Sequence, residues 1–434
     1  MNIAICTLGC KVNQYETQAM ERELVRRGHA LVPFEGPADA YIVNTCTVTA
    51  VSDKKSRQMI RRARKQSPDA VVAVCGCYPQ THPQDAEALD VDLVAGTGDR
   101  MRFLDLLEDA AREKEPVVSL DEALRRRTFE VLPAGGLAER TRAMLKVEDG
   151  CANFCSYCII PYARGPVRSL PAETAEEEVR RLAAEGYREI VVTGIEISSW
   201  GRDLPGRPAL ISLVERLCRE AGGARVRLGS LEPRTITEDF CRRAAALPNL
   251  CPHFHLSLQS GCDATLKRMD RKYGTARYLE SVDLLRKHFQ KPGPAITTDL
   301  IVGFPGETEE EFAQTLDFIQ RCAFSAMHIF PYSKRPGTPA ASMPGQVPNA
   351  VKEARAREAG AAAARMERRS LEQWKRVEVL FEEEKDGLWW GHTPRYCKVG
   401  VESGENLHNQ LRQVDVTGVA GNALMGELAP EREA

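Results

Sequence analysis

The sequence lacks any apolar run long enough to cross a bilayer, and it starts without a basic leader or a signal-peptide core. It also lacks a large net charge: the formal value of −2 excludes a surface covered throughout by basic residues, although local basic patches are compatible with it. We therefore expect a cytoplasmic protein with no membrane partner. Its 434 residues exceed what one hydrophobic core usually supports, so two or three domains are predicted.

Paired C-x-x-C knuckles, the usual pattern of a structural zinc site, are absent as well, although the chain has 14 cysteines. Their uneven distribution fits metal ligation in a reducing compartment better than disulfide bonding. Three of them, Cys151, Cys155 and Cys158, follow the spacing C-x-x-x-C-x-x-C in one short loop. A [4Fe–4S] cluster held only by protein needs four thiolates, so three would leave one iron with an exchangeable position. The alternatives for this trio are a zinc knuckle and three core cysteines.

Short β-rich runs alternate with helical stretches over residues 1–125, which predicts a small α/β domain with a mainly parallel sheet. A polar linker rich in arginine, proline and glycine follows and indicates a domain boundary. The expected strands are 2–7, 40–44, 70–74 and 91–95, and the expected helices are 15–27 and 52–66.

The same alternation resumes on a larger scale over residues 137–368 and predicts a partial (β/α)6 barrel, whose site should lie at the carboxyl ends of the strands. The trio of cysteines follows the first of these strands. The expected strands are 144–147, 189–193, 225–229, 253–258, 295–302 and 326–329, and the expected helices are 172–185, 208–221, 237–246, 275–288 and 309–322.

An alanine- and arginine-rich segment, 348–375, predicts a helix that leads out of the barrel. Four short β-rich runs follow it, with glycine and asparagine at the turns. They predict a small β-barrel over residues 370–434. The expected strands are 377–383, 388–391, 398–402 and 413–418.

A second trio of cysteines follows successive strands of the first domain: Cys10, Cys46 and Cys77. Loops that leave the same ends of parallel strands converge on one edge of the sheet, so these three can meet. Any one of them alone is better explained as a small buried hydrophobe. Cys75 should still belong to its strand, so we choose Cys77 as the third member. The remaining cysteines, for example Cys6, Cys218, Cys241 and Cys322, are predicted core residues.

Both cysteine sets and their flanking residues resemble the radical S-adenosylmethionine (SAM) methylthiotransferase family. The loop with an aromatic residue, Tyr157, beside the last cysteine looks like the radical SAM signature. The stretches TLGCKVNQYET at 7–17 and NTCTVT at 44–49 are most similar to the members that act on N6-threonylcarbamoyladenosine in tRNA. The resemblance covers the whole chain and implies that residues 370–434 form a TRAM domain.

The resemblance implies that a methylthio group replaces the C2 hydrogen of this nucleoside at position 37, in the anticodon loop. One SAM would supply the methyl group and a second SAM the radical, with an electron donor such as flavodoxin or ferredoxin. Two [4Fe–4S] clusters are implied. Their ligands would be Cys10, Cys46 and Cys77 for one cluster, which carries sulfur, and Cys151, Cys155 and Cys158 for the radical SAM cluster.

Polar residues at the predicted barrel strand ends are implied SAM contacts, and each could instead be a strand-end cap or turn former. Glycine at position 194 would allow close approach of the SAM amine. Glu196 departs from the histidine expected in close relatives, so a side-chain role there is in doubt. The implied contacts are Gly194, Ser230, Ser257, Gln259, Asp299 and Tyr332.

Two segments predict RNA contact. Seven basic residues crowd the predicted helix 52–66, which follows Cys46, whereas such a run is usually only a solvated face. The predicted β-barrel adds Trp389, Trp390, Arg395, Tyr396 and Lys398, which could stack on bases and bind phosphates. We expect one of these tryptophans to pack inward and the basic residues to face RNA.

Three alternatives stay open at this point. The same chemistry could act on isopentenyladenosine in tRNA or on an aspartate of a ribosomal protein. The third is of another class, a non-catalytic RNA-binding protein with structural zinc.

Overall fold

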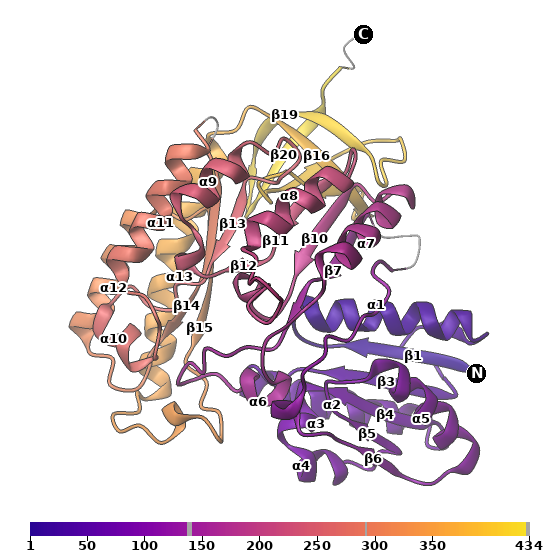
Figure 1. Ribbon diagram of the computed structural model, residues 1–434. Helices are drawn as coiled ribbons and strands as arrows, with labels where there is room; N and C mark the ends of the chain where they lie inside the picture. The colour runs from indigo at the N-terminus through magenta and orange to yellow at the C-terminus, as the bar shows by residue number, and fades with distance from the viewer. Residues whose placement is uncertain (137–140, 291–292, 431–434) are drawn as a thin grey trace.

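The computed structural model describes residues 1–136, 141–290 and 293–430. An N-terminal α/β part lies below a central partial barrel, and a C-terminal β-barrel lies on the opposite side of it (Figure 1). The predicted domain start at residue 137 and the last four residues, 431–434, lie outside the described residues. The helix that leads out of the barrel continues through the predicted boundary at 368–370, and the boundaries themselves stay predictions.

The N-terminal sheet is parallel throughout, with the strand order β2-β1-β3-β4-β5-β6. The order reverses between β1 and β3, and loops diverge at such a switch point to leave a crevice at the carboxyl ends of the strands. The strands are β1 (Asn2–Thr7), β2 (Ala30–Val32), β3 (Ala40–Thr45), β4 (Val71–Gly76), β5 (Leu93–Ala95) and β6 (Val117–Ser119).

Helices cover both faces of this sheet and bury apolar residues against it. Met20 and Leu24 of one helix pack on one face together with Phe103 of another, and Ile60 packs on the other face. Strands β2 and β6 were not predicted, because three-residue edge strands are too short for an alternating pattern. The helices are α1 (Lys11–Arg26), α2 (Ala50–Gln66), α3 (Cys77–Thr81), α4 (Pro83–Glu87) and α5 (Arg100–Glu113).

Six β/α units follow in barrel order, as predicted, but the third strand is divided at Gly229. A Cβ at this glycine would lie 3.0 Å from the Val192 carbonyl oxygen, so the backbone packs closely there. The strands are β7 (Arg142–Lys146), β10 (Glu189–Thr193), β11 (Arg225–Leu228), β12 (Ser230–Leu231), β13 (His253–Leu256), β14 (Ala295–Val302) and β15 (Ala326–Pro331). A short antiparallel pair, β8 (Glu148–Asp149) and β9 (Arg168–Ser169), follows β7.

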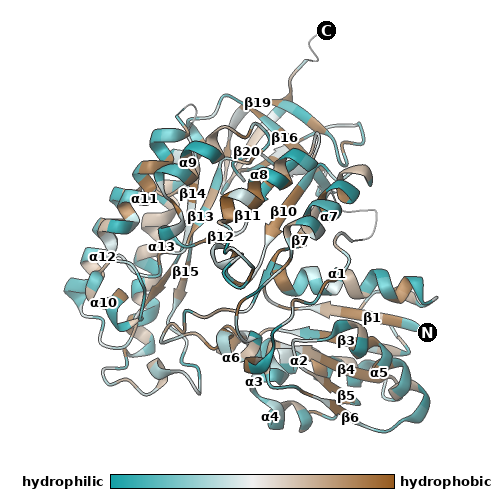
Figure 2. Cartoon of the chain, in the orientation of Figure 1, coloured by the Kyte–Doolittle hydropathy of each residue, from teal (hydrophilic) through white to brown (hydrophobic). Residues whose placement is uncertain are grey.

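The barrel helices lie outside the strands, with apolar residues facing inward and polar residues outward (Figure 2). Those between the strands are α6 (Ile160–Arg164), α7 (Ala172–Ala184), α8 (Leu210–Glu220), α9 (Glu238–Ala245), α10 (Asp263–Arg268), α11 (Thr275–His288) and α12 (Glu309–Cys322). Helix α13 (Asn349–Glu372) then leads to the C-terminal domain. Single 3₁₀ turns lie at Ala123–Arg125, Ile197–Ser199, Pro233–Thr235 and Pro339–Ala341.

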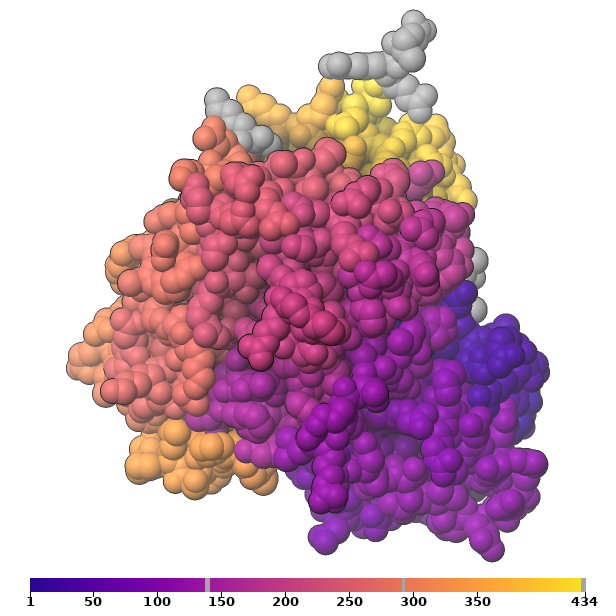
Figure 3. Space-filling view, in the orientation of Figure 1, coloured from indigo at the N-terminus to yellow at the C-terminus, as the bar shows by residue number. Residues whose placement is uncertain are grey.

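The N-terminal part and the barrel share one hydrophobic core. Tyr15 and Ala19 of α1 are buried in the same cluster as Leu145 of β7, and the Tyr15 hydroxyl donates to the Leu132 carbonyl at 2.5 Å. Figure 3 shows the two parts in contact along this face, with the C-terminal domain on the opposite side of the barrel. The packing therefore places the carboxyl ends of both parallel sheets toward each other.

The C-terminal domain is a closed five-stranded barrel. Its fifth strand was not predicted, because Gly426 interrupts an already short apolar run. The strands are β16 (Arg376–Lys385), β17 (Leu388–His392), β18 (Lys398–Val401), β19 (Leu411–Ala420) and β20 (Ala423–Leu428). The described part of the chain holds no helix with the length and apolar content of a membrane span.

One tryptophan of this domain does pack inward, as predicted: Trp389 is part of the small core. The expectation that Arg395 faces RNA was wrong, because its Nε donates to the Gly293 carbonyl at 2.6 Å, at the barrel. Tyr396 was misplaced too. Its ring stacks on His253 of β13 at 5.2 Å and so helps to dock the two domains.

Candidate active site at the domain interface

Cys10, Cys46 and Cys77, called the first triad below, lie in the loops at the carboxyl ends of β1, β3 and β4. Cys10 is the N-cap residue of α1, which begins one turn earlier than predicted. Gly9 adopts φ +103°, and a Cβ there would lie 2.8 Å from the Cys46 sulfur, so the first two loops touch. Burial raises the pKa of Cys77 to about 12 despite the nearby Arg164, and Cys46 and Cys10 contribute to the rise, so the three thiols lie close to one another.

Cys75 lies inside β4 and is fully buried, as expected for a strand residue. It packs with Phe103 and Leu104 of α5, on the face of the sheet covered by α1 and α5. Its position is therefore that of a core residue.

Cys151, Cys155 and Cys158, called the second triad below, lie between β8 and α6. The Cys151 amide donates to the Gly165 carbonyl at 3.0 Å, and the Cys158 amide donates to the Cys155 carbonyl at 2.9 Å. These bonds fold the loop back on itself. Burial and then the neighbouring Cys155 raise the pKa of Cys158 to about 12, so these thiols also face one another.

The donor sets suit clusters with an open iron. Within the described ranges, no group of three or more His, Cys, Asp or Glu side chains is arranged closely enough to hold a single metal ion. In a [4Fe–4S] cluster each thiolate binds a different iron, so the sulfurs need not share one centre. The electrostatic contacts within each triad involve three thiols, which matches a cluster with one exchangeable position.

Arg271 contacts the second triad and was missed by the sequence analysis. Its guanidinium donates to the Cys155 sulfur at 3.2 Å and to Glu232 at 3.2 Å. Asn153, inside the cysteine loop, also donates to Glu232 at 3.2 Å. Hydrogen bonds to ligand sulfurs tune a cluster's reduction potential. The sequence offers no signal for this role, because Arg271 lies in a loop after α10, far along the chain from the cysteines.

A pocket is lined by residues of the second triad's loop and by residues that follow Cys46 of the first triad. Val48 and Thr49, which follow Cys46, line one side of it, and Tyr157 and Cys158 line another. Three of the implied SAM contacts also line this pocket: Asp299 within β14, Gln259 after β13 and Tyr332 after β15. The Tyr332 hydroxyl is buried without a hydrogen-bond partner in the described structure, so it is free to bind a ligand group.

The other three implied contacts do not line this pocket. A Cβ at Gly194 would lie 2.8 Å from the Glu148 carboxylate, so this glycine makes room for Glu148. Ser230 is exposed, and the Ser257 carbonyl accepts a hydrogen bond from the Tyr273 hydroxyl. Their contact with SAM stays a prediction.

Glu196 acts as a cap, the alternative considered for such strand-end residues. Its carboxylate accepts from the Ser198 amide at 3.0 Å and from the Ser199 hydroxyl at 2.8 Å, at the start of a 3₁₀ turn. Burial and the nearby Glu232 raise its pKa. The side chain therefore holds the loop that follows β10.

Helix α2 begins at the pocket. The Ala50 amide donates to the Ser333 hydroxyl at 3.0 Å, and Ser333 lines the pocket. Farther along α2, some basic residues are engaged; Arg64, for example, pairs with Asp92 at 2.6 Å. Four exposed basic residues of the helix have no ion-pair partner among the residues that the structure describes: Lys54, Lys55, Arg61 and Lys65.

Comparison with known proteins agrees with this architecture. Residues 145–319 match the Radical SAM superfamily, and residues 2–96 match the Uncharacterized protein family UPF0004. A similar solved structure is the radical S-adenosylmethionine methyltransferase TsrM from Kitasatospora setae, with a TM-score of 0.55 at 18% identity over 79% of this chain and 77% of that one. At this identity the likeness concerns the fold alone.

Curated relatives cover nearly the whole chain. The Threonylcarbamoyladenosine tRNA methylthiotransferase MtaB of Bacillus subtilis (strain 168) is 40% identical over 95% of this chain and 93% of its own length. The tRNA-2-methylthio-N(6)-dimethylallyladenosine synthase of Carboxydothermus hydrogenoformans is 36% identical over 82% of this chain and 81% of its own length. These similarities show that the chain belongs to the radical SAM methylthiotransferase family.

Proposed function

We propose that this enzyme replaces the C2 hydrogen of N6-threonylcarbamoyladenosine at position 37 of tRNA with a methylthio group. One SAM gives its methyl group to a sulfide and becomes S-adenosylhomocysteine, and a second SAM takes the hydrogen atom and leaves as methionine and 5′-deoxyadenosine. The C2–H bond breaks and a C2–S bond forms. The electron that cleaves the second SAM comes from a donor such as flavodoxin or ferredoxin, and one electron is released when the C–S bond forms.

The first and second triads would each hold a [4Fe–4S] cluster; when bound, one supplies the electron for SAM cleavage and the other carries the sulfur. One observation supports this most strongly. The same pocket is lined by Cys158 of the second triad and by Val48 and Thr49, which follow Cys46 of the first. The loops of both triads therefore border the space in which a substrate base would bind.

The residues around the pocket position the reactants. Gln259 and Asp299 offer polar groups to the ribose or amino-acid part of SAM, and Tyr332 offers a free hydroxyl. Ile301 and Phe330 add apolar surface to the same pocket. Helix α2 starts at the pocket, and its exposed lysines and arginines suit the phosphates of an anticodon loop in the cytoplasm.

The choice of nucleoside is supported by the printed name of the Bacillus subtilis relative and by the stretches at 7–17 and 44–49. Isopentenyladenosine in tRNA is the second candidate, because a relative named for that modification is 36% identical. The two are distinguished by offering the reconstituted enzyme tRNA that carries either nucleoside. Methylthiolation of only the isopentenyl form, measured by mass spectrometry of nucleosides, would contradict the proposal.

Iron analysis tests the two-cluster assignment. After anaerobic reconstitution the native chain should bind about eight irons, and alanine variants of either triad about four. The variant without the first triad should still cleave SAM to 5′-deoxyadenosine but should form no methylthio product. Cys218→Ala and Cys322→Ala, which change buried helix cysteines, serve as controls and should keep all the iron. Stoichiometric zinc without iron would instead support the RNA-binding alternative.

A further inference from the structure

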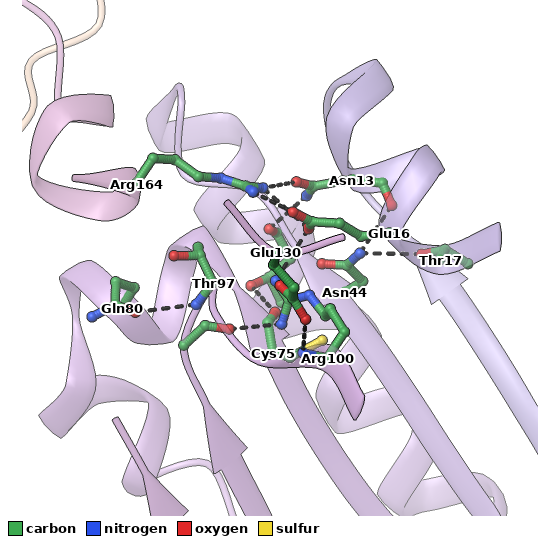
Figure 4. A network of polar contacts seen from close by, with 12 residues as sticks. Asn13, Glu16, Thr17, Asn44, Cys75, Gln80, Thr97, Arg100, Glu130 and Arg164 are labelled. Carbon is green, nitrogen blue, oxygen red and sulfur yellow. Dashed lines mark hydrogen bonds and ion pairs between the residues drawn. The ribbon is translucent and has the colours of Figure 1, made fainter. Parts of the chain in front are cut away.

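A buried polar network joins the N-terminal domain to the barrel (Figure 4). Glu16 of α1 lies at its centre, and its carboxylate pairs with Arg164 of α6, with Arg100 of α5 at 3.1 Å and with Lys146 of β7 at 3.5 Å. These four side chains are at most 1% exposed. Two of the cations come from the barrel, and Arg164 is on the helix directly after the second triad.

Asn13 connects this network to the loops of the first triad. Its Nδ2 donates to the Leu8 carbonyl at 2.8 Å, before Cys10, and to the Thr45 carbonyl at 2.9 Å, before Cys46. Its Oδ1 accepts from the Arg164 guanidinium at 2.7 Å. One arginine of the barrel thus orients the side chain that ties two loops of the first triad together.

Thr45 extends the connection to the third loop. Its hydroxyl donates to the Cys75 carbonyl at 2.6 Å and accepts from the Tyr78 amide at 3.3 Å, on either side of Cys77. All three loops of the first triad therefore depend on hydrogen bonds that run through Asn13 and Thr45.

The network carries more positive than negative charge. Asp149, near the second triad, lies 3.2 Å from Lys146, 3.6 Å from Arg164 and 3.4 Å from Arg168. The carboxylates of Glu16 and Asp149 thus face four buried cations: Arg100, Lys146, Arg164 and Arg168. A further carboxyl, Glu130, accepts from the Arg100 amide at 2.5 Å, so the four cations outnumber these three carboxyl groups.

Buried charge is costly unless a counter-charge lies near it. Arg164 and the Cys77 sulfur interact electrostatically, so part of the excess charge lies beside the first triad. A [4Fe–4S]²⁺ core with three thiolates has a net negative charge, which would supply the missing counter-charge.

We propose that Arg164 is a positioning residue for the first triad: it holds Asn13, which together with Thr45 ties the three loops, and it places a compensating positive charge beside Cys77. The barrel thereby aligns the neighbouring domain's cluster with its own cysteine loop. This inference rests on the proposed function, because it needs a cluster at the first triad.

The test uses the full chain with all three cysteines of the second triad changed to alanine, so that only the first triad can hold iron. Arg164→Met removes both the positive charge and the hydrogen-bond donors of the guanidinium, and Arg164→Lys keeps the charge alone. Asn13→Ala removes only the side-chain hydrogen bonds that join the loops of Cys10 and Cys46. The matched control is Arg355→Met, which removes another buried arginine, paired with Glu307 at 2.8 Å on the outer side of the barrel. Iron content, iron release to a chelator and the midpoint potential are measured after anaerobic reconstitution.

Arg164→Met should shift the midpoint potential to a more negative value, because reduction adds negative charge that the guanidinium no longer offsets. Arg164→Lys should keep a potential near the parent's but release iron faster, and Asn13→Ala should do the same. The control should match the parent in both properties.

The possible failures can be told apart. If the parent binds no iron, the cluster assignment in the proposed function is wrong and this inference falls with it. If the parent binds about four irons but Arg164→Met has the same potential and release rate, only this inference is overturned. If Arg164→Met does not fold, by circular dichroism, unchanged iron release in both Arg164→Lys and Asn13→Ala would overturn it.

Discussion

Glu189→Gln should loosen the C-terminal domain from the barrel. The Glu189 carboxylate binds the Arg227 guanidinium through two contacts, at 2.7 and 2.8 Å, and both side chains are fully buried. Arg225 adds a third contact at 2.9 Å. Arg227 in turn donates to the carbonyls of Thr393 and Pro394, at 3.1 and 2.9 Å, so the pair holds the segment between β17 and β18 against the barrel.

Removal of one partner leaves buried guanidinium charge uncompensated, which costs about 3–5 kcal/mol. Because each 1.4 kcal/mol is a tenfold change, local opening of the docked segment should become roughly a hundredfold to several-thousandfold more frequent. Hydrogen–deuterium exchange of peptides that cover residues 388–401 measures this directly.

Asp415→Asn is the matched control, because Asp415 makes a similar two-contact pair with Arg376 within the C-terminal domain. That pair is 44% and 49% exposed, so solvent screens it and exchange should stay unchanged. Equal exchange in the native chain and in Glu189→Gln would show that the buried pair does not hold the domains together.

Three further outcomes are expected. Burial raises the pKa of Glu189, but Arg227 and Arg225 lower it more, to about 2, below the usual 4.5. The stabilisation from this pair is therefore complete above about pH 4.5 and is lost as the pH falls toward 2. The difference in exchange between the native apoprotein and Glu189→Gln should accordingly begin to shrink below pH 4.5. Arg271→Met, tested in a chain without the first triad, should make the second cluster harder to reduce in a potentiometric titration; an unchanged potential would refute a role for its contact with Cys155. Lys54→Glu with Lys55→Glu should weaken tRNA binding and reduce the slope of log affinity against log salt by at least about 1, whereas Lys267→Glu, exposed on α10, should change neither.

Local pattern was enough to predict much of the fold. Strands β1, β10 and β14 and helices α11 and α12 have the predicted bounds, because each is a β-rich run or a helical apolar pattern that is continuous over its whole length. Prediction was poorer where the pattern is short or interrupted. Strand β20 contains Gly426 and was missed. The start of α1, at Lys11, was predicted one turn too late, because a cysteine N-cap is not a usual start signal.

Tertiary contacts decided what surrounds the cysteines. Nothing near Arg164, Arg271 or Arg227 in the chain indicates burial, since arginine is usually exposed. Each is buried in an ion pair with a carboxylate from another part of the chain: Arg164 with Glu16, Arg271 with Glu232 and Arg227 with Glu189. The sequence likewise predicted that Tyr396 stacks on RNA bases, whereas in the structure its ring stacks on His253.

The sequence by itself determined the fold class, the cysteine spacings and the strand ends at which the two triads sit, because these depend on short-range periodicity and on the rule that parallel strands end together. Only the tertiary structure decided that Cys158 and the loop after Cys46 line one pocket and that buried arginines join the domains. Those features come from packing between segments more than a hundred residues apart, and burial and charge pairing at such separations leave no local trace in the chain.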